Sequence, residues 1–167
     1  YKTPDVYVRE KSLLPPSVAE VATAIPAFIG YTLKTEDAKQ QSLLQQPMRV
    51  TSMVEFETLF GGPYLEAFEL MLKEDGTGYK VTNADAPVFF FHQAVSHFFA
   101  NGGGACWIIS IGKAESGTSL DQEAFEDAID KLEEVDEVTL ISTPESIGLG
   151  AVAHYAVQNK ALQHAEK

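Results

Sequence analysis

One thiol and four imidazoles are the side chains of this chain best suited to nucleophilic or metal chemistry. Cys106 is the only cysteine, and His92 and His97 are the candidate general bases for it. Cys106 lies in the apolar run ACWIISIG, where a thiol is usually buried, neutral and inert. His92 and His97 are five residues apart, about 140° around a helix, so they do not present one face to a metal ion. His154 and His164 are isolated on the last expected helix. The prediction is no catalytic residue and no metal ligand.

Two glycine clusters could bind phosphate. Asn101 to Gly104 lies between an expected helix and an expected strand, whereas a phosphate-binding loop requires the order strand, loop, helix. We therefore interpret it as the end of a helix. Gly148 to Ala153 follows a strand and opens a helix, but a TPES loop comes before it, so the match to a dinucleotide-binding fingerprint is weak. The sequence predicts no cofactor.

Ser119 is better explained as a helix cap than as a nucleophile. Ser119 and Gln122 have the spacing of a capping box, and no His-Gly motif or strand-end Asp upstream completes a catalytic triad. Paired carboxylates are plentiful only in Asp121 to Glu137, which holds nine acids and one lysine. Such a run is usually the solvated face of a helix, although it could also face a basic neighbour. We expect that the chain is not an enzyme.

Hydrophobic periodicity predicts the elements that position these residues. Strands are expected at 25–32, 48–51, 65–72, 79–82, 105–112 and 138–142. Helices are expected at 52–60, 88–100 and 148–166, and directly after residue 119. Gly76 and Gly78 would turn a hairpin between the third and fourth strands. The order strand, helix, strand from Ala105 to Ser142 predicts a parallel crossover. The expected fold class is α/β, with a mixed, partly parallel sheet flanked by helices.

Composition narrows the function classes. The chain has 167 residues, 45% of them apolar, which is enough for one folded domain with a core. A net charge of −12 disfavours binding to nucleic acid or to an anionic membrane surface. No apolar run approaches the roughly 20 residues needed to span a bilayer. The single cysteine fits a reducing cytoplasm.

The first 24 residues have the pattern of an extended arm, followed by a core domain at 25–167. An amino-terminal strand, with Val6 and Val8 on one face, precedes a linker that contains Pro15 and Pro16. Such a strand has unpaired backbone groups, and the sheet of another chain could pair with them. The expected inter-subunit arm comprises Tyr1, Lys2, Thr3, Pro4, Asp5, Val6, Tyr7, Val8 and Arg9. The expected linker or hinge comprises Leu13, Leu14, Pro15, Pro16 and Ser17.

Four motifs, in this order, extend over nearly the whole chain: YKTPDVYV, LPPSVAEVATAIPAFIGYT, TLFGGP and FFANGGGACWIISIG. Together they resemble the amino-terminal half of the contractile tail sheath family. That family includes the sheaths of contractile phage tails, of R-type bacteriocins and of phage-tail-like extracellular injection systems. The family pattern has Gly where this chain has Asp5. Family members also continue to a carboxy-terminal arm, so we expect this chain to be a fragment.

The resemblance implies a structural subunit that polymerises around an inner tube and contracts to drive it through a target envelope. It implies as partners other sheath subunits, identical or paralogous, the inner tube protein, and baseplate and terminal cap proteins. It further implies that the arm adds a strand to a neighbour's sheet, beside that neighbour's carboxy-terminal arm. Assembly would take place in the bacterial cytoplasm, followed by incorporation into a phage tail or a released particle.

Two alternatives stay open from the sequence. One is a small α/β ligand-binding or enzymatic domain that uses the loops at 112–118 and 143–150. The other is a sheath-related cap or baseplate component that does not contract.

Overall fold

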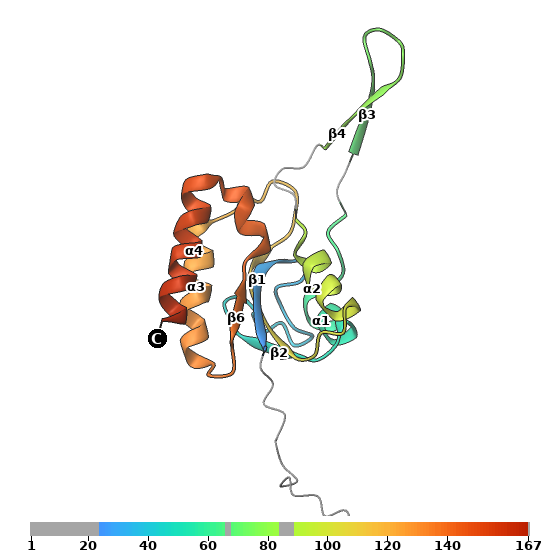
Figure 1. Ribbon diagram of the computed structural model, residues 1–167. Coiled ribbons are helices and arrows are strands. Elements are labelled where there is room, and N and C mark those ends of the chain that lie inside the picture. Colours follow the sequence, from blue (N-terminus) through green and yellow to red (C-terminus); the bar gives the residue numbers. More distant parts are fainter. Residues whose placement is uncertain (1–23, 66–67, 84–88, 167) are drawn as a thin grey trace, which may run out of the picture.

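A mixed sheet of four strands is the centre of the fold (Figure 1). In the computed structural model, residues 24–65, 68–83 and 89–166 are described. The strand order is β2-β5-β1-β6. β1 (Pro26–Thr32) pairs in parallel with β5 (Cys106–Lys113) on one side and with β6 (Leu140–Ser142) on the other, and β2 (Met48–Val50) pairs antiparallel with β5. The predicted α/β class and the partly parallel sheet are confirmed.

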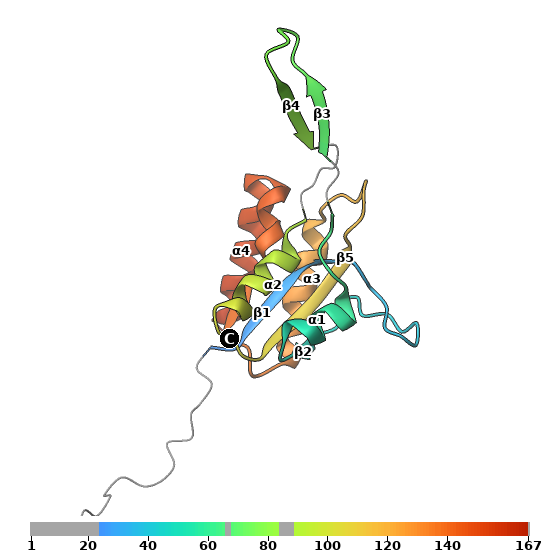
Figure 2. The same ribbon diagram turned by 90° about the vertical axis from the view of Figure 1, so that its right-hand side faces the viewer.

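Helices cover both faces of this sheet (Figures 1 and 2). α1 (Met53–Phe60) and α2 (Phe91–Ala100) pack on one face. α3 (Gln122–Lys131) and α4 (Ala151–Ala165) lie side by side on the other. Two short 3-10 helices precede β6 and α4: η1 (Leu132–Glu134) and η2 (Pro144–Leu149).

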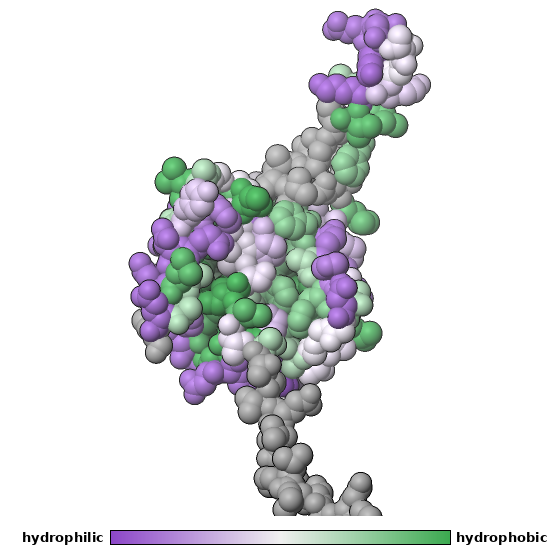
Figure 3. All heavy atoms as spheres, viewed as in Figure 1, coloured by the Kyte–Doolittle hydropathy of each residue, from purple (hydrophilic) through white to green (hydrophobic). Residues whose placement is uncertain are grey.

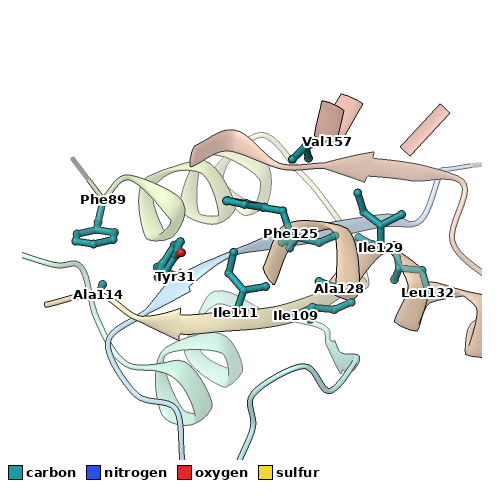
Figure 4. Packing of buried hydrophobic residues seen from close by; sticks show 12 residues of the cluster. Tyr31, Phe89, Ile109, Ile111, Ala114, Phe125, Ala128, Ile129, Leu132 and Val157 are labelled. Carbon is teal, nitrogen blue, oxygen red and sulfur yellow. The ribbon is translucent and has the colours of Figure 1, made fainter. Parts of the chain in front are cut away.

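Each face of the sheet has its own hydrophobic core. All seven residues of β1 are buried, as expected for a central strand covered on both sides. Alternate residues of β1 face opposite cores: Ala27, Ile29 and Tyr31 belong to the core under α3, and Phe28 belongs to the core under α1 and α2. Figure 4 shows Tyr31 in the first of these cores, close to Phe125 and Phe89. The α3 side is completed mainly by Phe89, Ile109, Ile111, Phe125, Ala128, Ile129, Leu132 and Val157. The α1 and α2 side is completed by Leu43, Val50, Phe56, Phe60, Phe91, Val95, Cys106 and Ile108.

The predicted hairpin is confirmed and projects away from the rest of the domain (Figures 1 and 2). It consists of β3 (Phe68–Leu72) and β4 (Tyr79–Asn83), which pair antiparallel. Gly76 and Gly78 have φ values of 68° and 154°, so both occupy backbone regions that favour glycine.

Several predicted boundaries are wrong by a few residues. α2 begins at Phe91, not at residue 88, and α4 begins at Ala151, after the separate 3-10 helix η2, rather than at Gly148. β6 begins at Leu140 rather than at residue 138. Ser119 does not cap α3: the side chain of Asp121 accepts a hydrogen bond from Glu123 N at 3.0 Å. Asp121 is the better cap because it stands directly before the first helical residue.

The sequence predicts an amino-terminal arm at residues 1–24, and residues 1–23 lie outside the described part of the chain. Within the described residues, no helix is both long and apolar enough to cross a bilayer.

Candidate functional site: the Glu145 junction and the exposed apolar surfaces

The predicted arm, Tyr1 to Arg9, and the predicted linker, Leu13 to Ser17, lie outside the described residues. The structure does fix where the preceding chain enters the domain. Ile25 N donates to Thr139 Oγ1 at 2.9 Å, and Thr139 N donates to Ile25 O at 3.0 Å. Any segment before Ile25 therefore joins the domain at the amino end of β1, next to the start of β6.

The thiol of Cys106 has the environment that the sequence predicted. Its side chain is fully buried in β5, and burial, with a smaller effect of Glu55, raises the pKa of the thiol to about 12. A thiol with this pKa stays protonated near neutral pH and is a poor nucleophile.

The histidines have different surroundings. His92 Nε2 lies 2.9 Å from a carboxylate oxygen of Glu57, and His97 is one turn away from Asn101 at the end of α2. The prediction that His154 is isolated is wrong, because its Nδ1 lies 2.9 Å from Ser146 Oγ. Across the described residues, no group of three or more His, Cys, Asp or Glu side chains could hold a metal ion.

The glycine clusters have structural explanations. Gly102, with a φ of 84°, ends α2, and a Cβ on Gly103 would lie 2.6 Å from the ring of Phe98. The prediction that Asn101 to Gly104 is a helix end is confirmed. Gly148 lies inside η2, where a Cβ would lie 2.6 Å from Leu120, and Gly150 turns the chain into α4 with a φ of 84°.

The most unusual polar group in the core is Glu145, which is 1% exposed. Its Oε2 accepts a hydrogen bond from Tyr31 N at 2.8 Å, and its Oε1 accepts one from Phe91 N at 3.0 Å. β6 pairs with β1 only as far as Phe28, and the chain then turns into η2, from which Glu145 supplies the acceptor for Tyr31. One carboxylate therefore joins β1, α2 and η2.

Glu145 also explains where α2 begins. Phe90 stands at the N-cap position and has no side chain that can accept a hydrogen bond. The first amide groups of a helix need acceptors, and a negative charge at this end is favourable. The carboxylate of Glu145 lies 54 residues after Phe91 in the chain. It provides both the hydrogen-bond acceptor and the negative charge from outside the helix.

Burial and hydrogen bonding act on Glu145 in opposite directions. Burial is the larger effect and raises the pKa of this carboxyl from 4.5 to about 7, while the N–H groups of Tyr31, Phe91 and Phe90 favour the charged form. A raised pKa is also typical of catalytic acids. Here both oxygens are engaged by backbone amides of the core, and we interpret Glu145 as a structural junction.

A polar network follows Glu145. Ser146 Oγ donates to Thr143 O at 2.7 Å and lies 2.9 Å from His154 Nδ1, and Gln158 donates to Thr143 Oγ1 at 3.1 Å. A hydroxyl has one proton, and Ser146 gives it to Thr143 O, so the tautomer of His154 that fits this network carries a proton on Nδ1 and donates it to Ser146 Oγ. This arrangement is the reverse of a serine activated by a histidine base, and Ser146 is fully buried. The network ties α4 to η2.

Sequence reasoning missed both the Glu145 junction and the Ser146 network. From the sequence, the segment TPES, residues 143–146, is interpreted as a plain loop. Its combination of an acid and hydroxyl residues beside Pro144, between a strand and a helix, was the available signal. The partners Tyr31 and Phe91 are 114 and 54 residues away from Glu145, and no local pattern identifies them.

Acidic side chains surround α3, and large apolar side chains are exposed elsewhere. Eight of the nine acids in Asp121 to Glu137 are exposed, as expected for a solvated helix face. Exposed large apolar residues occur on the β3-β4 hairpin and around β6 and α4. Those of the hairpin are Phe68, Leu70, Met71, Leu72, Tyr79 and Val81. Those around β6 and α4 are Leu140, Ile147, Val152, Tyr155 and Leu162.

Comparison with models of known protein families gives no match, and no curated protein is significantly similar to this chain.

Proposed function

We propose that the chain is a structural subunit of a contractile tail sheath, which polymerises around an inner tube and contracts to drive the tube through a target envelope. The observation that carries this proposal is the set of four sequence motifs in one order along nearly the whole chain. The role is mechanical and involves no catalysis, cofactor or metal.

The positions of the motifs in the fold are consistent with this proposal. IPAFIGYT extends over β1, the central strand, and TLFGGP contains the end of α1 and its left-handed Gly61. FFANGGGACWIISIG contains the end of α2, the glycine turn and most of β5. These three segments therefore form the central parallel strand pair and the helix ends beside it. They are parts of one fold, and not unconnected short stretches of sequence.

The main alternative is a small α/β enzyme or ligand-binding domain, and the carboxyl ends of the strands offer it little room. Ligands of open α/β sheets bind in the crevice at that edge. Here the buried side chains of Tyr31, Phe89 and Glu145 lie there. A hollow beside Tyr31, Phe89 and Ala114 has a volume of about 10 Å³, about the space of one water molecule.

In the proposed assembly, the arm Tyr1 to Arg9 adds a strand to the sheet of a neighbouring subunit, and Leu13 to Ser17 acts as a semi-rigid hinge. Strand addition depends on backbone hydrogen bonds, so the link can persist while the globular parts reorient. The partners are other sheath subunits, the inner tube protein, and baseplate and cap proteins. Assembly takes place in the bacterial cytoplasm and leads to a phage tail or a released particle.

The test is negative-stain electron microscopy of the full-length protein, with and without residues 1–12. We expect striated hollow rods from the intact protein. We expect no rods from the deletion, although its circular dichroism spectrum and melting temperature should match those of the intact protein. Rods of normal length from the deletion would refute the role of the arm. A monomer that binds a small molecule tightly would favour the enzyme or ligand-binding alternative, and a single ring or disc would favour a cap or baseplate component.

A further inference from the structure

The turn after α2 contains the pair Asn101-Gly102, in which a side-chain amide precedes a residue without a side chain. Of the three asparagines in the sequence, only Asn101 is followed by glycine, whereas Asn83 and Asn159 are followed by alanine and lysine. An asparagine before glycine is especially prone to deamidation, because no Cβ on the next residue hinders the approach of its backbone nitrogen. Both Asn101 and Gly102 are exposed, so water reaches the two groups that would react.

The reaction is an intramolecular acyl transfer. The nitrogen of Gly102 loses its proton and attacks the side-chain carbonyl carbon of Asn101, which closes a succinimide ring. The bond from Cγ to Nδ2 of Asn101 breaks, and the amide nitrogen leaves as ammonia. Water then opens the ring at either of its carbonyl carbons, and the product is aspartate or isoaspartate. Water is consumed and ammonia is released, and the reaction needs no oxidant, metal or cofactor.

In the folded structure both reacting groups are held away from each other. Gly102 N donates to Phe99 O at 3.1 Å. Asn101 Nδ2 donates to His97 O at 2.7 Å and lies 3.3 Å from His97 Nδ1. The ψ angle of Asn101 is 19°, which turns its Cβ away from Gly102 N, so closing the ring requires rotation about this bond. The last turn of α2 therefore engages the nucleophile and holds the side-chain amide back over the helix.

Packing against Phe98 stabilises this turn. Gly103 N donates to Phe98 O at 3.0 Å, and a Cβ on Gly103 would lie 2.6 Å from the ring of Phe98. That ring contacts Phe28 of β1, with 5.3 Å between the ring centroids. At Gly102 and Gly104, by contrast, an added Cβ would meet no atom within 4 Å. Ordering a run of glycines costs more conformational entropy than ordering other residues, so we expect this turn to open locally before the domain unfolds.

The turn is separate from the exposed apolar surfaces of the domain. In Figures 1 and 2 the carboxyl end of α2 lies toward the end of the domain away from the β3-β4 hairpin. Figure 3 shows exposed apolar side chains on the stem of the hairpin and around β6. The turn at 101–104 contributes none of the large exposed apolar residues. Its chemistry is therefore that of an exposed polar turn.

We propose that Asn101-Gly102 is a deamidation site of this chain, which is closed while the last turn of α2 is formed and reacts when that turn opens. The inference does not rest on the proposed function, because it uses only the fold of α2 and the turn that follows it.

The product cannot restore the turn as it was. A carboxylate at position 101 has no N–H to donate to His97 O, and its charge lies at the carboxyl end of α2, where the helix dipole disfavours anions. Isoaspartate also adds a methylene group to the backbone close to Gly103, which packs tightly on Phe98. Deamidation therefore leaves a permanent chemical record that this turn has opened.

The test follows deamidation of the folded chain in buffer and of the same chain unfolded in urea, both at neutral pH. Peptide mass spectrometry measures the product at each asparagine, and electron-transfer fragmentation separates isoaspartate from aspartate. In urea we expect Asn101 to react faster than Asn83 and Asn159. In the folded chain its rate should be lower by about tenfold or more, which corresponds to an opening free energy of about 1.4 kcal/mol or more. Equal rates at Asn101 and Asn159 in urea, or equal rates at Asn101 in the two states, would overturn the proposal.

Hydrogen exchange tests whether opening of the turn controls the reaction. The amide of Gly102 exchanges when its hydrogen bond to Phe99 O breaks, and ring closure requires this opening as well as rotation at Asn101. Folding should therefore slow deamidation at least as strongly as it slows exchange at Gly102. A smaller effect on deamidation than on exchange would mean that Asn101 reacts while the turn is closed, which would refute the proposal.

A pair of variants separates this turn from the rest of the core. Phe98→Leu removes the ring beneath Gly103 and should speed deamidation of the folded chain several-fold. Ile129→Val truncates the core on the other face of the sheet and, as the matched control, should leave the rate unchanged. Both are measured in buffer in which urea titration shows each variant to be folded. Equal acceleration in both variants would assign the reaction to unfolding of the whole domain and would overturn the proposal, and so would no acceleration in Phe98→Leu.

Discussion

Glu145 should make the folded state more stable in mild acid than above neutrality. Its carboxyl has a pKa of about 7 in the folded protein, compared with 4.5 when exposed. The folded state therefore binds the proton more tightly than the unfolded state. This contribution to stability is fully present below about pH 4.5 and is lost as the pH rises through about 7.

The expected magnitude follows from the two pKa values. Between about pH 8 and about pH 5, proton linkage at this one group should add about 2.5 kcal/mol to the free energy of unfolding. The range stops at about pH 5 because the isoelectric point is near 4.6, where association would interfere. Other carboxylates titrate as well, so the informative quantity is the difference between the wild type and a variant that lacks only this titration.

The assay is urea unfolding, followed by circular dichroism, of the wild type and Glu145→Gln at several pH values. Glutamine stays neutral, so the wild type should gain about 2.5 kcal/mol relative to the variant on going from about pH 8 to about pH 5. Infrared spectroscopy of the folded wild type should show a buried protonated carboxylic acid at the lower pH that is absent at the higher pH. A difference in stability that stays constant over this range would refute the reasoning. It would mean that the amides of Tyr31 and Phe91 outweigh burial and keep Glu145 ionised.

Two further predictions use matched pairs of variants and the same unfolding assay. Asp121→Ala should lower the free energy of unfolding by about 1 kcal/mol, through loss of the α3 cap, whereas Ser119→Ala should change it little; the reverse order would restore Ser119 as the cap. Gly30→Ala should destabilise the protein by about 1–3 kcal/mol, because a Cβ would lie 2.3 Å from the ring of Phe91. Its control, Gly104→Ala, introduces a Cβ with no atom within 4 Å, and equal losses in the two variants would contradict the packing argument.

Much of the fold could be predicted because its signals are local. β1 and β5 are continuous apolar runs, which is the pattern of strands buried on both faces. The start of α1 was predicted from Ser52, whose side chain accepts a hydrogen bond from Glu55 N at 3.2 Å. In each case the residues that determine the structure are neighbours in the sequence.

The errors occur where the determining partner is distant. α2 begins at Phe91 because the amide of Phe91 donates a hydrogen bond to Glu145, which lies in η2. The sequence around position 88 does not reveal this distant acceptor. The prediction that His154 is isolated is wrong because its partner, Ser146, precedes it by eight residues and lies in a different element. Periodicity describes which face a residue is on, but it does not identify the residue on the opposing element.

The apolar face of the hairpin is an intermediate case. The turn glycines predicted that the hairpin exists, but its apolar face depends on the pairing of Leu70 with Val81 and Leu72 with Tyr79. A shift of one residue in that register would place Lys80 among the apolar side chains. The candidate interaction surface is therefore a property of the register, which the structure supplies.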